Sequence, residues 1–388
     1  MHKQQPRIAI VGGGPGGLTL AKILATRGLA STVFELDAHP LARPQGGSLD
    51  LHVESGQRAL REAGLADDFR RLARHEDQEL RVFDKHGATL HEDTDTSGDR
   101  PEIDRTVLRA LLIDSLPAGT LRWGQKIRAI EAHTDGSYGI VSDAPTEPDA
   151  ADERFDLVVG ADGAWSRVRP LVSSATPSYT GVTFADLTIA DVDTAHPALA
   201  RLVGHGKMFA LGDGKGIIAQ RNDGGLVRVY LAFREPEAYL SSLVDVSDPT
   251  RARRALARLF DGWSPALTAF VTEAGDAIAL RPLVALPVGH RWPHRPGVTL
   301  LGDAAHVMSP FTGEGVNIAM LDATLLALAI ADAGDGWRAA VQRYEEDLFA
   351  RAAIEAALAA DGLVHAISPS APASFLAAVA AHHPDAAA

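Results

Sequence analysis

The chain contains no cysteine among its 388 residues, which excludes disulfide bonds, thiolate metal sites and a cysteine nucleophile. Basic residues are scarce as well, with 37 Lys and Arg against 50 Asp and Glu. The resulting net charge of -13 repels nucleic acids and anionic membrane surfaces. The arginines of residues 251–258 are therefore interpreted as the solvated face of a helix rather than as a phosphate-binding patch.

Long apolar runs are also missing. The apolar residues 8–24 could imitate a signal peptide, but glycines at 12, 13, 14, 16 and 17 interrupt them. No other stretch reaches the roughly 18 uninterrupted apolar residues of a membrane span, so we expect none. The 46% hydrophobic and 22% charged residues are typical of a soluble globular chain long enough for about two domains. We expect it in the cytoplasm.

Residues 7–37 have the pattern of a dinucleotide-binding unit: strand, tight turn, amphipathic helix and second strand. Gly12 permits the tight turn, Gly14 lets the backbone approach a pyrophosphate, and Gly17 allows the helix to pack closely on the strand. Glu35 ends the second strand, where it can accept hydrogen bonds from a ribose and would repel the 2′-phosphate of NADP. The alternative is that these glycines form an ordinary glycine-rich loop. The strand, helix, second strand and acidic residue follow in the order and spacing of a dinucleotide-binding unit, which favours binding of FAD or NAD.

A second pattern lies at residues 298–317, where an apolar strand ends at Asp303 and a loop leads to a helix beginning near Gly315. An aspartate at a strand end can bind ribitol hydroxyls, and helix N-H groups stabilise an anionic flavin edge. FAD is long enough to reach both patterns. The following helices are predicted from 316 to about 333 and from 337 to about 367.

Residues 180–235 change character to strand-like runs divided by Gly and Asp turns, which predicts an antiparallel sheet. Gly212, Gly214 and Gly216 imitate a nucleotide fingerprint, but a strand follows them, so a hairpin turn is favoured. Further hairpins are predicted at residues 79–92 and at Asp135-Gly136.

Three stretches together resemble the motifs of FAD-dependent aromatic hydroxylases of the para-hydroxybenzoate hydroxylase type: "GGGPGG" with Glu35, "DLVVGADGAWSRVR" and "GDAAHVMSPFTGEGVN". The stretches "GGSLDLH", "IDRTVLRALLIDSL" and "MSPFTGEGVN" are similar to tetracycline-inactivating monooxygenases of the TetX type. The resemblance implies an α/β fold with a Rossmann-like FAD-binding domain, an inserted antiparallel β-sheet substrate domain and a C-terminal helix. We expect the FAD domain at 1–75, 102–173 and 282–332, the substrate domain at 76–101 and 174–281, and the bridging helix and tail at 333–388.

The resemblance also implies site residues. Arg43 would lie near the flavin ring where nicotinamide approaches, Arg109 would contact the flavin or its ribitol, and Asn317 would line the pyrimidine edge. The full set of expected cofactor contacts is Gly12, Gly14, Gly17, Glu35, Arg43, Asp50, Arg109, Asp162, Gly163, Asp303, Pro310, Gly315 and Asn317. Phe311 would lie at the substrate cavity. The expected substrate contacts on the inserted sheet are Lys207, Gln220 and Arg228.

Other interpretations stay open for some of these residues. Asp162 and Gly163 could form a helix-capping turn, and Asp50 could form a structural ion pair with Arg109. Glu314 departs from the glutamine usual in the family, and we expect its side chain to point to solvent.

The histidines of the chain suggest structural roles. His306 is expected to be structural rather than catalytic. We expect no metal site, because Pro293 prevents the helix that would pair His290 with His294.

The implied reaction is a monooxygenation. NADPH or NADH reduces the flavin, dioxygen forms a C4a-hydroperoxide, and one oxygen atom passes to an electron-rich phenol or enol such as tetracycline or a related polyketide. Epoxidation, Baeyer-Villiger oxygenation and non-catalytic sequestration of an aromatic ligand are the alternatives. We expect a monomer that acts on a small aromatic or polyketide substrate.

Overall fold

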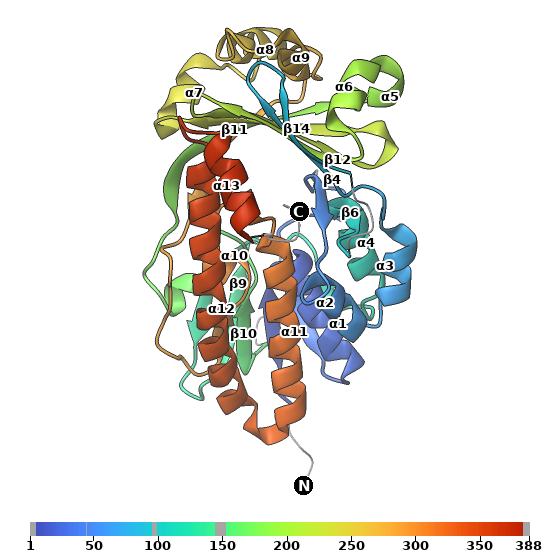
Figure 1. The fold of residues 1–388 in the computed structure, drawn as a ribbon. Coiled ribbons are helices and arrows are strands. Elements are labelled where there is room, and N and C mark those ends of the chain that lie inside the picture. The colour runs from blue at the N-terminus through green and yellow to red at the C-terminus, as the bar shows by residue number, and fades with distance from the viewer. Residues whose placement is uncertain (1–4, 44, 95–98, 144–152, 383–388) are drawn as a thin grey trace.

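Two β-sheets lie one above the other in the computed structural model, which describes residues 5–43, 45–94, 99–143 and 153–382 (Figure 1). The lower sheet is parallel, with the strand order β16-β10-β1-β2-β7. Its strands are β1 (Ile8–Val11), β2 (Ser31–Phe34), β7 (Leu121–Arg122), β10 (Leu157–Gly160) and β16 (Val298–Leu300). The first and third predicted motifs therefore meet in one sheet, although nearly 300 residues separate them.

Helix α1 packs on the lower sheet through its apolar side, and further helices pack around it. Helix α1 begins at Pro15, whose fixed φ suits a first helical position, and buries Leu18, Ile23 and Leu24. It packs against α4 and α11. The helices are α1 (Pro15–Thr26), α2 (Gly56–Glu62), α3 (Ala66–Leu72), α4 (Arg105–Asp114), α10 (Asp303–His306), α11 (Gly315–Ala333) and α12 (Trp337–Ala366). The predicted helices 316–333 and 337–367 are confirmed.

The upper sheet has the strand order β15-β11-β14-β13-β12-β4-β5. Its strands are β4 (Glu79–Asp84), β5 (Thr89–Asp93), β11 (Ser178–Ile189), β12 (Gly206–Gly212), β13 (Lys215–Arg221), β14 (Val227–Arg234) and β15 (Ala279–Ala285). The antiparallel sheet predicted for residues 180–235 is confirmed by the β11–β14, β12–β13 and β13–β14 pairs. Strand β4, from an earlier part of the chain, joins this sheet by pairing with β12 in parallel. We take the two sheets as the centres of the two proposed domains.

Side chains on the upper sheet alternate between two faces, as a pleated sheet requires. The outer face carries apolar residues such as Met208, Val229 and Leu231, which pack against the outer helices. These helices are α5 (Val192–Ala195), α6 (Pro197–Val203), α7 (Glu237–Leu243), α8 (Pro249–Arg258) and α9 (Pro265–Thr272). The inner face, which carries Lys207 and Phe209, points toward the lower sheet.

Three predicted hairpins are confirmed. Strands β12 and β13 turn at Asp213 and Gly214, both with positive φ, so Gly212, Gly214 and Gly216 belong to a hairpin. Strands β4 and β5 turn at Gly87, and β8 (Ile127–Ala132) and β9 (Tyr138–Ser142) turn at Gly136. A short pair, β3 (Ser48–Asp50) with β6 (Glu102–Asp104), lies between the two large sheets.

The C-terminal helices join the two halves of the molecule. Helix α12 runs upward beside α11, and α13 (Ala373–His382) returns beneath the upper sheet (Figure 1). Helix α13 was not predicted, because Pro369 and Pro372 precede it. Phe375 of α13 stacks on Phe209 at 5.1 Å between ring centroids.

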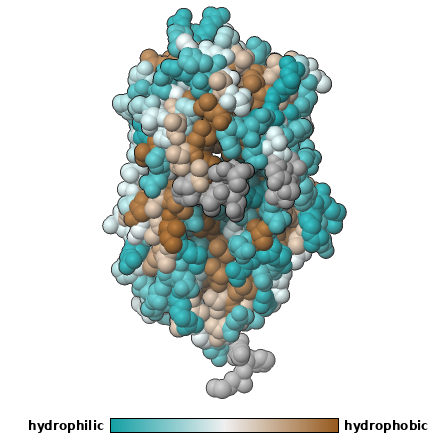
Figure 2. Space-filling model, in the orientation of Figure 1, coloured by the Kyte–Doolittle hydropathy of each residue, from teal (hydrophilic) through white to brown (hydrophobic). Residues whose placement is uncertain are grey.

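By length and composition alone, the segment Gly315–Ala366 is apolar enough to cross a membrane, contrary to the expectation from uninterrupted runs. In the structure it forms two helices, and half of its most apolar window is buried. Core helices pass the same criterion, so the observation is weak support for a span. The visible surface in Figure 2 is largely hydrophilic, with apolar side chains gathered toward the middle of this face.

Candidate active site

A cavity of about 580 Å³ lies between the two sheets, at the carboxyl ends of the lower strands. Ligands of open α/β sheets bind at this edge. Of the expected cofactor residues, the cavity brings together Gly14, Asp50, Gly163, Asp303, Pro310 and Gly315. Of the expected substrate residues, it is lined by Lys207, Gln220 and Phe311. We call this space the inner cavity.

The first glycine loop has the geometry that its spacing predicts. Gly12 has φ +109°, and a Cβ atom there would lie 2.3 Å from the Ala161 carbonyl oxygen. A Cβ atom on Gly17 would lie 2.0 Å from the Gly12 carbonyl oxygen. A Cβ atom on Gly14 would meet no atom within 4 Å, because this position faces the inner cavity. Gly12 and Gly17 thus serve the turn and the packing, while Gly14 leaves room for a ligand.

Glu35 and Arg109 lie on the far side of the glycine loop. Glu35 is buried and accepts hydrogen bonds from the Gly13 and Asp37 backbone N-H groups at 2.5 and 2.9 Å. The Arg109 guanidinium lies 3.5 Å from Glu35 and 3.1 Å from Asp37. Arg43 also pairs with Asp37, at 2.9 Å.

The structure gives Arg43 and Arg109 protein partners, and their expected contacts with the flavin stay predictions. Arg43 and Arg109 were placed near the flavin ring and ribitol, but both form ion pairs beside the end of β2, and neither is among the described residues lining the inner cavity. Arg109 is held there by its carbonyl contacts with Gly13 and Pro40. From this position Arg109 can stabilise the glycine loop that would bind the ADP half of the cofactor.

Arg105 lines the inner cavity instead, although it was not among the residues predicted from the sequence. It is the first residue of α4, in the same "IDRTVLRALL" stretch that suggested Arg109. No ion pair from the described residues reaches its guanidinium, and burial lowers its pKa. A helix-opening arginine after a short strand was the available signal.

Asp303 opens α10 shortly after the end of β16 at Leu300 and lines the inner cavity. It is accessible through the cavity yet lies deep in the molecule, and burial raises its pKa. Within the described part of the chain, no donor is hydrogen-bonded to its carboxylate. An unpartnered carboxylate at a strand end fits a ligand that brings hydroxyl groups, as the ribitol of FAD does.

Replacing Asp303 with alanine is expected to weaken FAD binding by about 10- to 100-fold, since hydrogen bonds to a charged group contribute about 1.5–3 kcal/mol. The apo-protein should be equally or more stable, because the variant removes a desolvated carboxylate without a partner. Fluorescence titration with FAD and thermal unfolding of the apo-protein measure the two effects. A loss of apo-protein stability would contradict this role.

The loop before α11 approaches the inner cavity through Pro310 and Gly315, as expected. Asn317 does not line it among the described residues. Its side chain is buried, accepts from the His52 and Gly56 N-H groups at 3.0 and 3.2 Å, and donates to the Asp50 carbonyl at 2.8 Å. Asn317 therefore connects α11 to the segment after β3 instead of facing the cavity at the expected pyrimidine edge.

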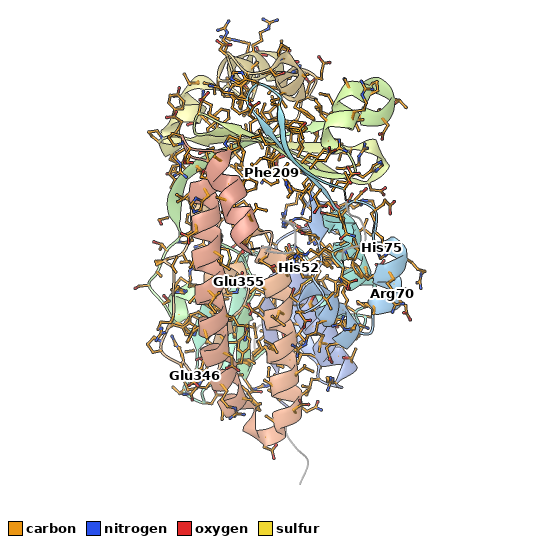
Figure 3. The ribbon with its side chains drawn as sticks, viewed as in Figure 1. His52, Arg70, His75, Phe209, Glu346 and Glu355 are labelled. Atoms are coloured by element: carbon orange, nitrogen blue, oxygen red, sulfur yellow. The ribbon has the colours of Figure 1, made fainter. Side chains whose placement is uncertain are left out.

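Glu314 does not point freely to solvent, which corrects that expectation. Its Oε1 lies 2.6 Å from His52 Nδ1, and both residues line a second cleft outside the inner cavity. Burial opposes protonation of His52, but hydrogen bonds to Asp50 and Glu314 raise its pKa to about 9. Figure 3 shows His52 between the two halves, near Glu355 of α12. The acidic departure from the family pattern is thus balanced by a cationic histidine.

Asp50 lies on β3 at the edge of the inner cavity. It does not pair with Arg109, so that alternative is wrong. Lys207 Nζ lies 3.2 Å from Asp50 and 3.1 Å from Glu102. Burial acts against the Asp50 carboxylate, but Lys207 and His52 hold its pKa well below the usual range. The sequence had suggested Lys207 and Asp50 separately, and the fold brings them together.

Apolar side chains form the roof of the inner cavity. Phe184 and Phe311 meet edge to face at 6.0 Å, and Phe184 lies 5.5 Å from Tyr230. The apolar lining includes Phe184, Phe209, Ile218, Tyr230 and Leu283 of the upper sheet and Met308 and Phe311 of the loop before α11. Arg228 was expected here, but its guanidinium pairs with Asp186 at 2.6 Å and does not belong to the described lining.

Asp162 serves the turn that the capping alternative describes. It accepts hydrogen bonds from Ser166 Oγ at 2.5 Å and from the Arg167 N-H group at 2.6 Å. Burial raises its pKa. Gly163 lines the inner cavity, so the two residues divide the structural and cavity roles.

The histidines occupy structural positions. His306 Nε2 lies 2.6 Å from Asp322 in the core beneath Asp303. His290 contacts Ser173 and the Ala305 carbonyl, while His294 contacts Glu345. In the described ranges, no cluster of three or more His, Asp or Glu side chains could hold a metal ion.

The geometry thus joins a glycine loop, a strand-end aspartate and a helix N-terminus around one cavity, and comparison with known proteins agrees. Residues 6–238 and 288–358 match the family described as "FAD binding domain". Monooxygenase penA of Penicillium thymicola is 34% identical over 363 residues, which cover 83% of this chain and 84% of the relative. Monooxygenase asqM of Emericella nidulans is 34% identical over 370 residues, with 83% of each chain covered.

Solved structures show the same fold. Klebsiella pneumoniae HpxO complexed with FAD and uric acid has a TM-score of 0.78 at 19% identity, covering 99% of this chain and 93% of that chain. Tetracycline destructase Tet(55) has a TM-score of 0.72 at 20% identity, covering 98% and 97%. The chain belongs to the FAD-binding-domain family, as an FAD-dependent monooxygenase of the aromatic hydroxylase type. FAD fits the open space at Gly14 and the Asp303 and Arg105 side chains, which form no hydrogen bond or ion pair with the described residues.

Proposed function

We propose that this monooxygenase hydroxylates an electron-rich phenol or enol, such as tetracycline or a related polyketide, with NADPH or NADH as reductant. The single observation that carries the proposal is that one cavity holds both the cofactor-type groups and an aromatic roof. Asp303 and Gly315 lie on its floor, and Phe184, Tyr230 and Phe311 lie above. A planar substrate between them would face the reacting edge of the cofactor.

Bound FAD, reduced by NAD(P)H, supplies the chemistry of dioxygen activation and oxygen transfer. The chain's residues provide the surroundings. The apolar roof excludes water from the cavity, and the N-H groups at the start of α11 favour negative charge near Gly315. Lys207 Nζ, at the cavity edge, can donate to a substrate oxygen.

Relatives support the substrate class without identifying the substrate. The solved structures of similar fold include two tetracycline destructases, Tet(51) and Tet(55), at TM-scores of 0.67 and 0.72. HpxO, with uric acid bound, represents a heterocyclic substrate in the same fold. Tetracycline is therefore the first compound to test, with simpler phenols as the next.

The test is NADPH and NADH consumption by the FAD-loaded protein, with and without tetracycline, together with the product mass and released hydrogen peroxide. Faster consumption with a mass gain of one oxygen atom supports the proposal for tetracycline. Product NMR then separates hydroxylation from epoxidation or Baeyer-Villiger oxygenation. If neither tetracycline nor any phenol or enol increases the rate of NADPH or NADH consumption, the proposed function is contradicted. That result would favour sequestration of an aromatic ligand.

A further inference from the structure

The polar edge of the inner cavity carries a lysine whose charge is already balanced. Lys207 Nζ lies between Asp50 Oδ2 and Glu102 Oε1, at 3.2 and 3.1 Å. An ammonium group has three protons, and these two carboxylates account for two of them. Because Lys207 lines the cavity, its third proton is available to an acceptor there.

Gln220 extends this edge on the neighbouring strand. It stands directly opposite Lys207 in the β12–β13 ladder, and adjacent strands lie about 4.8 Å apart. Its Nε2 donates weakly to Glu102 and to the Ser48 carbonyl, at 3.3 and 3.5 Å. Among the described residues no donor is hydrogen-bonded to its Oε1. The edge therefore offers one donor, at Lys207, beside one acceptor, at Gln220.

The next row of the same face is apolar. Phe209 and Ile218 oppose each other in the β12–β13 ladder, and Ile218 opposes Tyr230 in the β13–β14 ladder. Figure 3 shows Phe209 on the underside of the upper sheet, above the space between the halves. A ligand that fits both rows is flat and mainly apolar, with its polar atoms on one edge.

The charges at this edge also discriminate between neutral and anionic ligands. Asp50 and Glu102 bring two carboxylates to the Lys207 ammonium, and Lys207 opposes the rise that burial causes in the pKa of Glu102. His52 offsets part of the Asp50 charge from 3.5 Å, but among the described residues it does not line the cavity. A substrate carboxylate placed at Lys207 would therefore still meet like charge at close range. Arg228 does not offset the two carboxylates, because it pairs with Asp186. Arg105 is the other cation that lines the cavity, and the Asp303 carboxylate acts on it electrostatically.

We propose, on the basis of the proposed function of the inner cavity, that the substrate is a neutral planar aromatic phenol or enol. One oxygen accepts from Lys207, and the O-H of that same oxygen, or an adjacent O-H or N-H group, donates to Gln220 Oε1. Asp50 and Glu102 exclude analogues that carry a carboxylate on this edge. Glu102 is a positioning residue, because it acts on the ligand through Lys207 and through its charge.

A matched pair of ligands tests the proposal on the FAD-loaded protein: 2-naphthol and its carboxylate analogue 3-hydroxy-2-naphthoate. Binding is measured by the change in flavin fluorescence and absorption, which needs no turnover. We expect 2-naphthol to bind at least about tenfold more tightly, a difference of about 1.4 kcal/mol. In Glu102→Gln, which keeps the shape and removes the charge, the ratio should fall at least about threefold.

Three results would overturn the proposal. Equal or tighter binding of the carboxylate in the wild-type protein, for instance through Arg105, would overturn the proposal, as would failure of both ligands to bind. An unchanged ratio in a folded Glu102→Gln variant would also overturn it. Asp50→Asn provides a second test if Glu102→Gln does not fold. Preferred binding of 2-naphthol without any oxygenated product from any phenol would instead contradict the proposed function alone.

Discussion

Replacing Gly14 with valine is expected to abolish FAD binding while the protein stays folded. Gly14 has φ -79° and ψ 178°, which a β-branched residue adopts, and an added Cβ atom would meet no atom within 4 Å. The side chain would instead occupy the cavity where a pyrophosphate approaches the backbone. Each charge-assisted hydrogen bond lost there costs about 1.5–3 kcal/mol, so we expect affinity to fall at least about 100-fold.

The stability of the apo-protein should change little, by about 1 kcal/mol, because Gly14 caps α1 and valine is a poorer cap. FAD retention after gel filtration and urea unfolding of the apo-protein measure the two quantities. Gly17→Val is the matched comparison, since its Cβ atom would lie 2.0 Å from a backbone oxygen and should destabilise the fold itself. Full FAD retention by Gly14→Val would place the cofactor elsewhere.

The contrast between Gly14 and Gly17 shows what the sequence can predict. Both are glycines of one fingerprint, and the spacing predicts the strand, turn and helix that make their roles differ. The strand-end position of Asp303 follows from the same local logic, because an apolar run of β type leads directly into it. Periodicity also predicts α11 and α12, whose buried residues recur at helical spacing.

Side-chain partners were less predictable, because they depend on contacts between distant segments. Arg109 and Arg105 stand one helical turn apart on α4, and only the packing of α4 decides that Arg109 turns toward Asp37 while Arg105 faces the cavity. Glu314 was predicted to point to solvent because its partner His52 lies about 260 residues earlier in the chain, and no local pattern indicates that contact. The parallel β4–β12 pair is likewise a long-range contact with no local signal.

The His306–Asp322 pair is the second place where a large effect is expected, because it supports the strand end that presents Asp303. Asp322 is fully buried and accepts from His306 at 2.6 Å, from the Gly302 N-H group at 3.1 Å and from Arg351 at 3.2 Å. Replacing Asp322 with alanine leaves a buried imidazolium without its counter-charge. We expect the free energy of unfolding to fall by about 3–5 kcal/mol near pH 6.

The loss should depend on pH in one direction. Burial opposes the charge on His306, but Asp322 raises its pKa above the ordinary value. The histidine's contribution is therefore complete below the unfolded pKa of about 6.5 and disappears as the pH rises through the higher folded value. The difference between wild type and Asp322→Ala should consequently be larger at pH 6 than at pH 9.

Asp332→Asn is the matched control on the same helix, because its side chain is 74% exposed and lies 3.8 Å from Arg27. Its effect should stay within about 0.5 kcal/mol at both pH values. Urea unfolding of the apo-protein at pH 6 and pH 9 measures the stability of wild type, Asp322→Ala and Asp332→Asn. A loss in Asp322→Ala that is equal at both pH values would show that His306 is neutral in the folded protein. The pair would then support Asp303 through packing and hydrogen bonding rather than through charge.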